Sequence, residues 1–316
     1  MSFKKVVVVG GGVLGSQIAY QIAYKGFDVT VWLRSEGSIE RAKPKFARWH
    51  DIYLKDLEQT KALIGTEAKS YPRGLIDDFV SLTVEKVDEL KAQADKAYEE
   101  LHYELDMKRA MKDADLIIES LSEDPKAKIA FYQSMAEVLP EKTVVVTNSS
   151  TMLPSTFASY TGRPDKYLAL HFANEIWKNN TAEIMGHSET NPKYYDEVVE
   201  FAQQIGMIPL KLKKEQPGYI LNSLLVPFLN AGQALLAKGV ADPETIDLTW
   251  MLGTGAPLGP FRILDIVGLD TAYNIVRMNP ESGNPDTIEG KIAKTLKEYI
   301  DAGKKGIATG EGFYKY

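Results

Sequence analysis

Short apolar runs alternate with amphipathic stretches along the first two thirds of the chain. Lys5 to Val9 is β-branched and apolar, which is typical of a strand buried on both faces of a parallel sheet. Apolar residues then recur at helical spacing from Leu14 to Lys25, and Gly26 ends this pattern. Asp28 to Leu33 is the next apolar run. This part of the chain therefore predicts a βαβ unit.

A long charged stretch follows this unit. From Glu36 to Asp113, lysine and glutamate recur at short spacing, which predicts a helical excursion with solvated faces. Apolar runs then resume and alternate with a helical pattern, as in a doubly wound sheet. The expected strands are Leu116–Ile118, Thr143–Thr147, Tyr167–His171, Glu183–Met185 and Met207–Leu210, with a helix at Lys126–Val138.

The pattern changes near Lys211–Pro217, where a charged run ends in a proline. Beyond this run the apolar spacing is mainly helical. The expected helices are Tyr219–Lys238, Pro243–Leu252, Pro260–Val267 and Ile288–Ala302. The prediction is an α/β chain: an N-terminal Rossmann domain with a doubly wound sheet and a helical excursion, residues 1–212, then an all-α C-terminal domain, residues 213–316.

Composition excludes several classes of function. The net charge of −6 argues against general nucleic-acid binding, which needs a clustered basic surface. The lack of cysteine excludes disulfides, thiolate catalysis and zinc-finger chemistry, and we expect no metal site. No apolar run approaches the roughly 20 residues that cross a bilayer, so we expect no membrane partner. The N-terminus passes directly into a strand without room for a signal peptide, so we expect a cytoplasmic location.

The turn after the first strand, Gly10-Gly11-Gly12-Val13-Leu14-Gly15, has the spacing of a dinucleotide-binding turn. It follows a strand and opens a helix, which is the context that this motif requires. Gly10 permits the tight turn, Gly12 lets the backbone approach a pyrophosphate, and Gly15 allows close packing of helix and strand. Free N–H groups at the helix start, those of Val13 and Leu14 among them, would face the phosphates. A strand–helix connection without a ligand is the alternative.

The end of the second strand bears on the choice of cofactor. NAD enzymes usually have an acidic residue there that binds the adenosine ribose. This chain has Leu33 at that place, followed by Arg34 and Ser35. The missing carboxylate removes repulsion against a 2′-phosphate, and the two polar residues could bind one. NADP(H) is therefore favoured and NAD(H) is the alternative.

Beyond the glycine turn, several motifs in the same order resemble those of the 3-hydroxyacyl-CoA dehydrogenase family, over nearly the whole chain. They are Asn148–Ser150 where the family has SNTSS, His171–Asn174 where it has HFFNP, Pro217–Asn222, Leu252–Phe261 with Gly268–Asp270, and the tail Thr309–Tyr314. The resemblance implies hydride transfer between a nicotinamide cofactor and a 3-hydroxyacyl or 3-oxoacyl substrate, in particular a CoA thioester, as in fatty acid metabolism.

His171 is the expected acid/base. Of the four histidines, it alone ends a buried strand at the carboxyl edge of the sheet, and a neutral imidazole suits the proton of an alcohol. The resemblance implies that Glu183, twelve positions later, is its partner. It also implies that Ser150 and Asn222 hold the substrate oxygen, and that Asn174 supports the histidine or the substrate.

Two further expectations rest on the resemblance. Glu123 and Lys128 match family positions that contact the cofactor, and a plain surface ion pair is the alternative for both. The family typically pairs through its C-terminal domain, whose helices here are too apolar to face solvent alone. We therefore expect a homodimer, with Met251, Leu252 and Phe261 in the core or the interface.

The substrate is less certain, because the chain departs from the family at two places. The family's proline and apolar residues after HFFN are replaced by Glu175–Ala182. The helical segment after the second strand has no lysine that aligns with the family's CoA-contacting positions. A second interpretation is thus the same chemistry on a free hydroxy acid or small ketone, as in relatives acting on carnitine or gulonate, with Lys178 meeting a carboxylate. A third is a non-catalytic dinucleotide-binding protein, against which the full set of catalytic residues argues.

Overall fold

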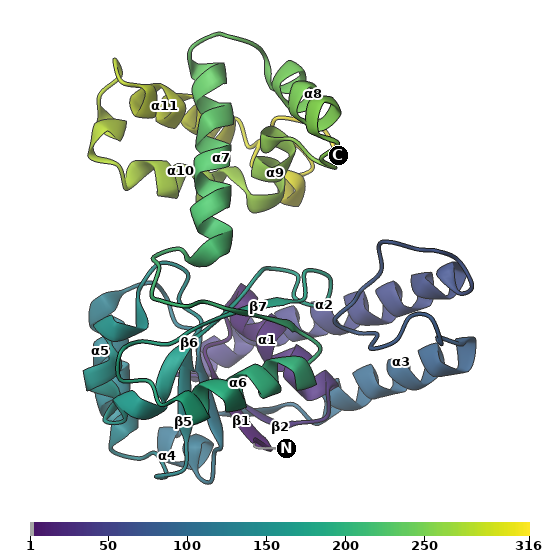
Figure 1. Cartoon of the computed structure of the whole chain (residues 1–316), viewed down its shortest axis with the longest axis vertical. Coiled ribbons are helices and arrows are strands. Elements are labelled where there is room, and N and C mark those ends of the chain that lie inside the picture. Colours follow the sequence, from purple (N-terminus) through teal and green to yellow (C-terminus); the bar gives the residue numbers. More distant parts are fainter. Residues whose placement is uncertain (1–2) are drawn as a thin grey trace. The chain divides into compact units, whose positions relative to one another are not determined.

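A single eight-stranded sheet organises the first part of the chain, with the strand order β3-β2-β1-β4-β5-β6-β7-β8 (Figure 1). The computed structural model describes residues 3–316. Neighbouring strands run parallel except for β6 and β7, which are antiparallel. The strands are β1 Lys5–Val9, β2 Asp28–Trp32, β3 His102–Glu104, β4 Leu116–Glu119, β5 Val144–Thr147, β6 Tyr167–Phe172, β7 Thr181–Met185 and β8 Ile208–Lys211.

Helices cover both faces of this sheet, as the sequence predicts. Val6 and Val8 of β1 belong to a core shared with α1, α2 and α3, whereas Val7 and Val9 belong to the core on the other face, shared with α4 and α5. This is why β1 is apolar at every position after Lys5. The helices are α1 Val13–Tyr24, α2 Glu36–Thr60, α3 Val84–Glu99, α4 Met107–Met111, α5 Pro125–Ala136 and α6 Pro192–Gln204.

The charged excursion is helical but also contains a strand that the sequence prediction missed. Helices α2 and α3 pack against each other, and α2 buries an apolar stripe beneath its charged face. After α3, the short strand β3 pairs with β2 at the edge of the sheet. Its three residues, His102 to Glu104, form no apolar run, so periodicity gives no signal for it. Only its position beside β2 makes it a strand.

The chain divides into two compact units, one ending at Ile220 and the other spanning Leu221–Tyr316. The second unit is built of helices, as expected, with isolated β-bridges in its tail. It contains most of α7 Tyr219–Ala237, with α8 Pro243–Thr254, α9 Pro260–Val267, α10 Leu269–Arg277 and α11 Ile288–Asp301. Helix α10 was not predicted. It begins directly after Gly268, whose positive φ of 90° turns the chain sharply between α9 and α10.

Two buried carboxylates fix the C-terminal tail of the second unit. Asp265 accepts hydrogen bonds from the backbone N–H groups of Phe313 and Tyr314 and from the Tyr316 hydroxyl. Asp247 accepts from the Tyr314 hydroxyl and from the backbone at the start of α9. The tail motif Thr309–Tyr314 therefore has a structural role, because its backbone satisfies carboxylates that would otherwise be buried without donors.

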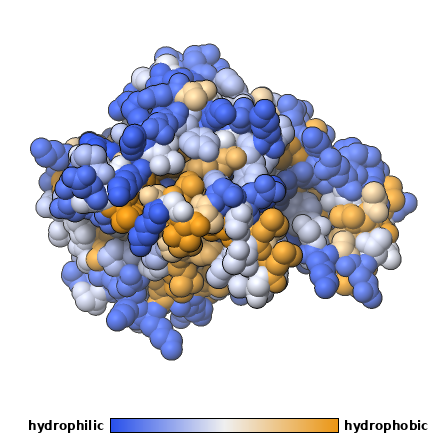
Figure 2. Space-filling view, turned by 90° about the horizontal axis from the view of Figure 1, so that it is seen from above, coloured by the Kyte–Doolittle hydropathy of each residue, from blue (hydrophilic) through white to orange (hydrophobic). Residues whose placement is uncertain are grey.

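Helix α7 corrects one expectation from the sequence. Among the residues that the structure describes, it is the one helix that is long and apolar enough, by length and composition, to cross a membrane. The prediction that no such run exists is wrong here, because uncharged polar residues such as Asn222, Asn230 and Gln233 interrupt the apolar run without adding charge. Hydrophobic residues also form patches on the surface shown in Figure 2. Leu224 on α7 and Leu252 on α8 are 69% and 82% exposed.

Candidate active site

The glycine turn joins β1 to α1 in the geometry that its sequence predicts. Gly10 has a φ of 104°, and a Cβ there would lie 2.6 Å from the carbonyl oxygen of Ser120. A Cβ on Gly15 would lie 2.5 Å from the carbonyl oxygen of Gly10. A Cβ on Gly12, in contrast, would meet no atom within 4 Å, so this side of the turn is open. Gly12 is the N-cap of α1, which places the first N–H groups of the helix at the open side.

A groove of about 600 Å³ runs from this turn along the ends of β2 and β4. Gly10, Gly11 and Gly12 line one end, and the Ser120–Ser122 loop after β4 lines its side. An open glycine turn at a helix N-terminus beside an elongated groove fits the pyrophosphate and adenosine of a dinucleotide. The residues present therefore fit a nicotinamide dinucleotide.

The adenosine end of this groove is cationic. Arg34, Arg41 and Lys45 line it together with Ser38. Leu33 is buried at the end of β2, where an acidic residue would otherwise be expected. Ser35 is the N-cap of α2, and its hydroxyl lies 3.0 Å from the hydroxyl of Ser38. Ser38, and not Ser35 as expected, lines the groove.

Arg41 and Lys45 were missed by the sequence analysis. With Ser38 they recur at a spacing of three or four residues across the first turns of α2, which places these three on one face of the helix, and Arg34 lies just before its N-cap. This spacing was visible in the sequence, but it was hidden among the many charged residues of the excursion. The geometry thus places three cations, rather than Arg34 alone, at this end of the groove.

His171 and Glu183 form the centre of the second part of the site. They are directly paired across the antiparallel strands β6 and β7, so their side chains lie on the same face of the sheet. His171 Nδ1 lies 3.1 Å from Glu183 Oε2, and both side chains are buried. Glu183 Oε1 also accepts a hydrogen bond from the backbone N–H of Ile220. This carboxylate therefore orients the imidazole with Nδ1 protonated and leaves Nε2 as the free base.

Ser150 completes a line of three side chains with this pair. Its hydroxyl lies 3.2 Å from His171 Nε2, on the opposite side of the ring from Glu183. Ser150 follows β5, at the carboxyl edge of the parallel strands, where open α/β sheets bind their ligands. The structure thus brings together three of the residues that the sequence analysis selected for catalysis.

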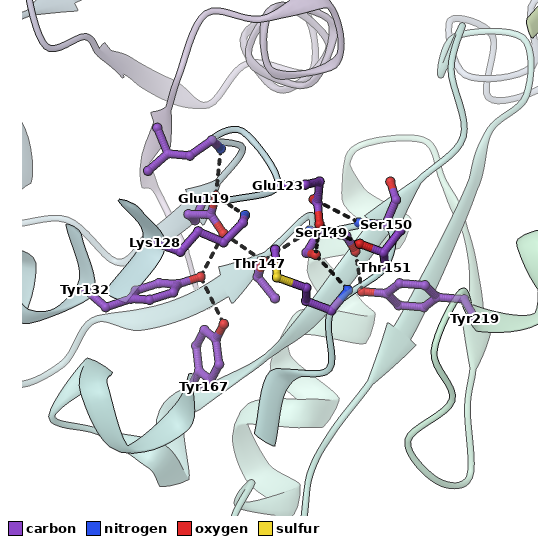
Figure 3. A network of polar contacts seen from close by, with 12 residues as sticks. Glu119, Glu123, Lys128, Tyr132, Thr147, Ser149, Ser150, Thr151, Tyr167 and Tyr219 are labelled. Carbon is purple, nitrogen blue, oxygen red and sulfur yellow. Dashed lines mark hydrogen bonds and ion pairs between the residues drawn. The ribbon is translucent and has the colours of Figure 1, made fainter. Parts of the chain in front are cut away.

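Glu123 anchors the loop after β5 through hydrogen bonds. Its carboxylate accepts hydrogen bonds from the Ser149 and Thr151 hydroxyls and from the backbone N–H of Ser150 (Figure 3). It forms no ion pair among residues 3–316. Glu123 therefore fixes the loop that carries Ser150, and its charge lies close to the line Glu183–His171–Ser150.

Lys128 is not available to a cofactor in this structure, contrary to the expectation from the resemblance. Its side chain is 0% exposed, and its Nζ lies 2.6 Å from Glu119 Oε1. Glu119, at the end of β4, also accepts from the Tyr132 and Thr147 hydroxyls and from the Leu121 N–H. Figure 3 shows this cluster beside the one around Glu123. A buried ammonium requires such a partner, because an uncompensated buried charge is costly.

Asn148 takes a supporting role in the site that was expected for Asn174. The Oδ1 atom of Asn148 accepts a hydrogen bond from the backbone N–H of Phe172, which ties the end of β5 to the end of β6 beside His171. Asn174 is exposed, and among the described residues its side chain makes no hydrogen bond to His171. Its carbonyl oxygen accepts from Asn179 instead. Asn222 belongs to the second unit, on α7.

The loop that departs from the family pattern is held down by two buried apolar side chains. Ile176 and Trp177 are buried, and the Trp177 indole N–H donates to Asp56 on α2. Lys178 Nζ lies 3.1 Å from the same carboxylate. In this structure the carboxylate that Lys178 meets is that of Asp56, and its contact with a substrate stays a prediction.

Comparison with known proteins identifies the family of the chain. The family description "3-hydroxyacyl-CoA dehydrogenase, NAD binding domain" matches residues 5–216, and "3-hydroxyacyl-CoA dehydrogenase, C-terminal domain" matches residues 218–316. A 3-hydroxybutyryl-CoA dehydrogenase from Clostridioides difficile is 30% identical over 99% of both chains. The solved structure of a diketoreductase acting on dicarbonyl compounds is 47% identical, with a TM-score of 0.83 over all of both chains. FadB2 of M. tuberculosis is 26% identical, with a TM-score of 0.76 over 99% of both chains.

Proposed function

Because the chain belongs to the 3-hydroxyacyl-CoA dehydrogenase family, we propose that it interconverts a 3-hydroxyacyl and a 3-oxoacyl compound with His171 as the acid/base. The chain is an oxidoreductase acting on a CH–OH group, with a nicotinamide-binding first domain. The observation that carries the proposed role is the line Glu183–His171–Ser150, buried at one end and open at the serine.

The proton path follows from this line. During oxidation, His171 Nε2 accepts the proton of the substrate hydroxyl, and the resulting imidazolium is stabilised by Glu183 through Nδ1–H. Ser150 donates a hydrogen bond to the substrate oxygen and so favours the charge that develops there. In the reverse direction the imidazolium returns the proton to the oxygen. The bound nicotinamide supplies the hydride acceptor or donor.

The cofactor that we propose is NADP(H). Arg34, Arg41 and Lys45 at the adenosine end supply cations suited to a 2′-phosphate, and the buried Leu33 adds no opposing carboxylate. Without the phosphate, these cations would repel one another at low ionic strength. NAD(H) lacks that phosphate and would gain less from them.

The two candidate classes of substrate both carry two carbonyl groups. A 3-oxoacyl-CoA carries a ketone two carbons from its thioester carbonyl, and CoA thioesters are named for the family and for the Clostridioides difficile relative. A dicarbonyl compound without CoA is the second candidate. Two observations favour it: the similarity to a diketoreductase and the folded-down loop Glu175–Asn180, which replaces the family pattern.

A panel of substrates and cofactors tests the proposed function. Acetoacetyl-CoA, free acetoacetate and an uncharged diketone would each be reduced with NADPH and with NADH, and kcat/KM compared. The proposal predicts turnover of at least one compound with NADPH preferred. A preference for the diketone over acetoacetyl-CoA would select the second candidate. No turnover of any of these compounds would contradict the proposed function.

We also propose that the chain forms a homodimer through its second unit. Leu224, Leu252 and Met278 are 69%, 82% and 74% exposed there, and they supply apolar surface that a second copy would bury. A second copy covering them would also account for the apolar α7 without a membrane. Size-exclusion chromatography with light scattering, at micromolar concentration and without detergent, should give the mass of a dimer. The mass of a monomer, or aggregates that only detergent disperses, would contradict this proposal.

A further inference from the structure

The segment Tyr219–Ile220 contacts the histidine, the carboxylate and the serine loop of the line Glu183–His171–Ser150. Its ring is stacked on the imidazole of His171, with the ring centroids 4.3 Å apart and the planes 14° from parallel. Its hydroxyl donates a hydrogen bond of 2.8 Å to the carbonyl oxygen of Ser149, the residue before Ser150 (Figure 3). The next residue, Ile220, donates its backbone N–H to Glu183 at 2.8 Å. One short segment therefore contacts the histidine, its carboxylate and the serine loop.

We propose that Tyr219 is a positioning residue for hydride transfer: its ring supports the protonated imidazole of His171, and its hydroxyl holds Ser150 in line. The inference rests on the proposed function and deepens it. The sequence analysis singled out Pro217–Asn222 only for Asn222. The structure assigns a separate role to the aromatic residue of the same segment.

The ring acts through its face. The face of an aromatic ring is electronegative, so a stacked ring favours a cation held against it. His171 becomes such a cation each time it takes the hydroxyl proton. The carboxylate of Glu183 on β7 lies 3.1 Å from His171 Nδ1, and Glu123 holds the backbone N–H of Ser150 at the Nε2 side. The stacked ring of Tyr219 acts together with Glu183 on the imidazolium and also fixes the plane of the imidazole.

The hydroxyl acts through the serine loop. Ser149 is held by Tyr219 at its carbonyl, by Glu123 at its hydroxyl, and by Thr147 at its N–H. Burial, together with the nearby carboxylates, raises the pKa of Tyr219 far above its ordinary value. The phenol of Tyr219 therefore stays protonated at neutral pH and keeps donating its hydrogen bond to Ser149.

The backbone conformation of Tyr219 is unusual, which indicates that the contacts of its side chain determine it. Its φ is 54°, in the left-handed region that non-glycine residues seldom adopt. Such conformations persist where surrounding contacts determine them, and they are frequent at functional sites. Here the contacts are the stack on His171 and the bond to Ser149.

Two substitutions separate the ring from the hydroxyl. Tyr219→Phe keeps the stack and removes the bond to Ser149. It should lower kcat by about 2- to 10-fold, the range expected for one hydrogen bond, and leave the pKa of His171 unchanged. Tyr219→Leu removes the stack as well. It should lower the pKa of His171 by about half a unit to one unit, because loss of a stacked ring disfavours the imidazolium.

The pKa of His171 can be measured by NMR titration of the imidazole signals, with His171→Asn to assign them. This readout needs no substrate, so it distinguishes failure of the inference from failure of the proposed function. Tyr24→Phe is the matched control, because the equally buried Tyr24 donates its hydroxyl to the carbonyl of Leu75, outside the catalytic line. It should change neither kcat nor the pKa of His171.

The outcomes that overturn the inference are distinct. An unchanged pKa of His171 in Tyr219→Leu would refute the role of the ring, and an unchanged kcat in Tyr219→Phe would refute the role of the hydroxyl. If Tyr219→Leu does not fold, Tyr219→Met replaces it, because methionine fills more of the ring's volume without an aromatic face. Its expected shift has the same direction.

Discussion

His171 and Glu183 face each other across the antiparallel strands β6 and β7, with Nδ1 and Oε2 3.1 Å apart. This register explains why they are twelve residues apart in the sequence. The chain passes the end of β6, crosses the loop that contains Trp177, and returns along β7 until the glutamate lies opposite the histidine. The antiparallel pairing thus fixes the orientation of the imidazole, and the rest of the proposed chemistry depends on it.

Replacing Glu183 should therefore slow the reaction without preventing folding. Glu183→Gln keeps the size of the side chain and an acceptor for Ile220, but it removes the negative charge that stabilises the imidazolium. We expect kcat to fall by about 100-fold or more, as for other carboxylates that orient a catalytic histidine. Steady-state kinetics with the preferred substrate measures this. Glu189→Gln, in the exposed loop after β7, is the control, and equal activity of the two variants would contradict the role of Glu183.

The cationic end of the groove should set the cofactor preference. Arg41→Ala and Lys45→Ala should each raise the Kd for NADPH by about 10-fold or more, the range for a hydrogen bond to a charged group. The Kd for NADH should stay nearly constant, because NADH has no 2′-phosphate. Arg34→Ala should behave in the same way. Fluorescence titration measures both constants.

Lys43→Ala is the matched control for these variants. Lys43 lies on the same helix, pairs with Glu40 and does not line the groove. Equal weakening of NADPH and NADH in the Arg41 and Lys45 variants would contradict a 2′-phosphate site there.

The buried pair of Lys128 and Glu119 should matter for stability. Lys128→Met leaves the carboxylate of Glu119 without its ammonium and should lower the free energy of unfolding by about 3–5 kcal/mol. The double variant Glu119→Gln, Lys128→Met removes both charges and should regain part of that loss. Urea unfolding measures both. A Lys128→Met variant as stable as the original protein, but with weakened cofactor binding, would restore the role that the family resemblance suggested for Lys128.

Acid should weaken the first unit partly through Asp115. Burial alone would raise the pKa of this carboxyl, but hydrogen bonds from Lys142 and from the backbone of Lys5 and Lys4 outweigh it and hold the pKa below its ordinary value. Since the pKa is lower in the folded protein, the carboxylate contributes stability above its unfolded pKa, and this is lost as pH falls through the folded value.

Asp115→Asn tests this sign. The variant should be less stable than the original protein at neutral pH, and the difference should shrink at about pH 3, below the ordinary pKa of aspartate. Urea unfolding at the two pH values gives the comparison. A difference of the same size at both would mean that the charge of Asp115 is not responsible.

Much of the fold was predictable because its signals are local. Each buried strand from β4 to β7 contains an apolar run, and the glycine turn lies in its usual context between a strand and a helix. The edge strand β3 and helix α10 were missed. One has no apolar run, and the other begins at Gly268 with no intervening loop. Their positions depend on neighbours that are distant in the sequence or on a single glycine conformation.

In the site, too, some features have local sequence signals and others depend on contacts between distant residues. The cofactor turn and Leu33 can be identified from the sequence, whereas the pairing of His171 with Glu183 depends on strand register, which spacing alone does not give. Lys128 and Glu119 are nine residues apart, on a helix and a strand, so their pairing appears only after folding. Tyr219 was missed because an aromatic residue between Gly218 and Ile220 gives no chemical signal until it is found against an imidazole.

The most direct test of the proposed chemistry is the turnover of His171→Ala, measured by nicotinamide absorbance with the preferred substrate, alongside its Kd for NADPH. We predict that kcat falls by about 10²- to 10⁴-fold, the usual contribution of a positioned acid/base, while the Kd for NADPH stays within about twofold of the original. Turnover close to that of the original protein would contradict the assignment of His171 as the acid/base.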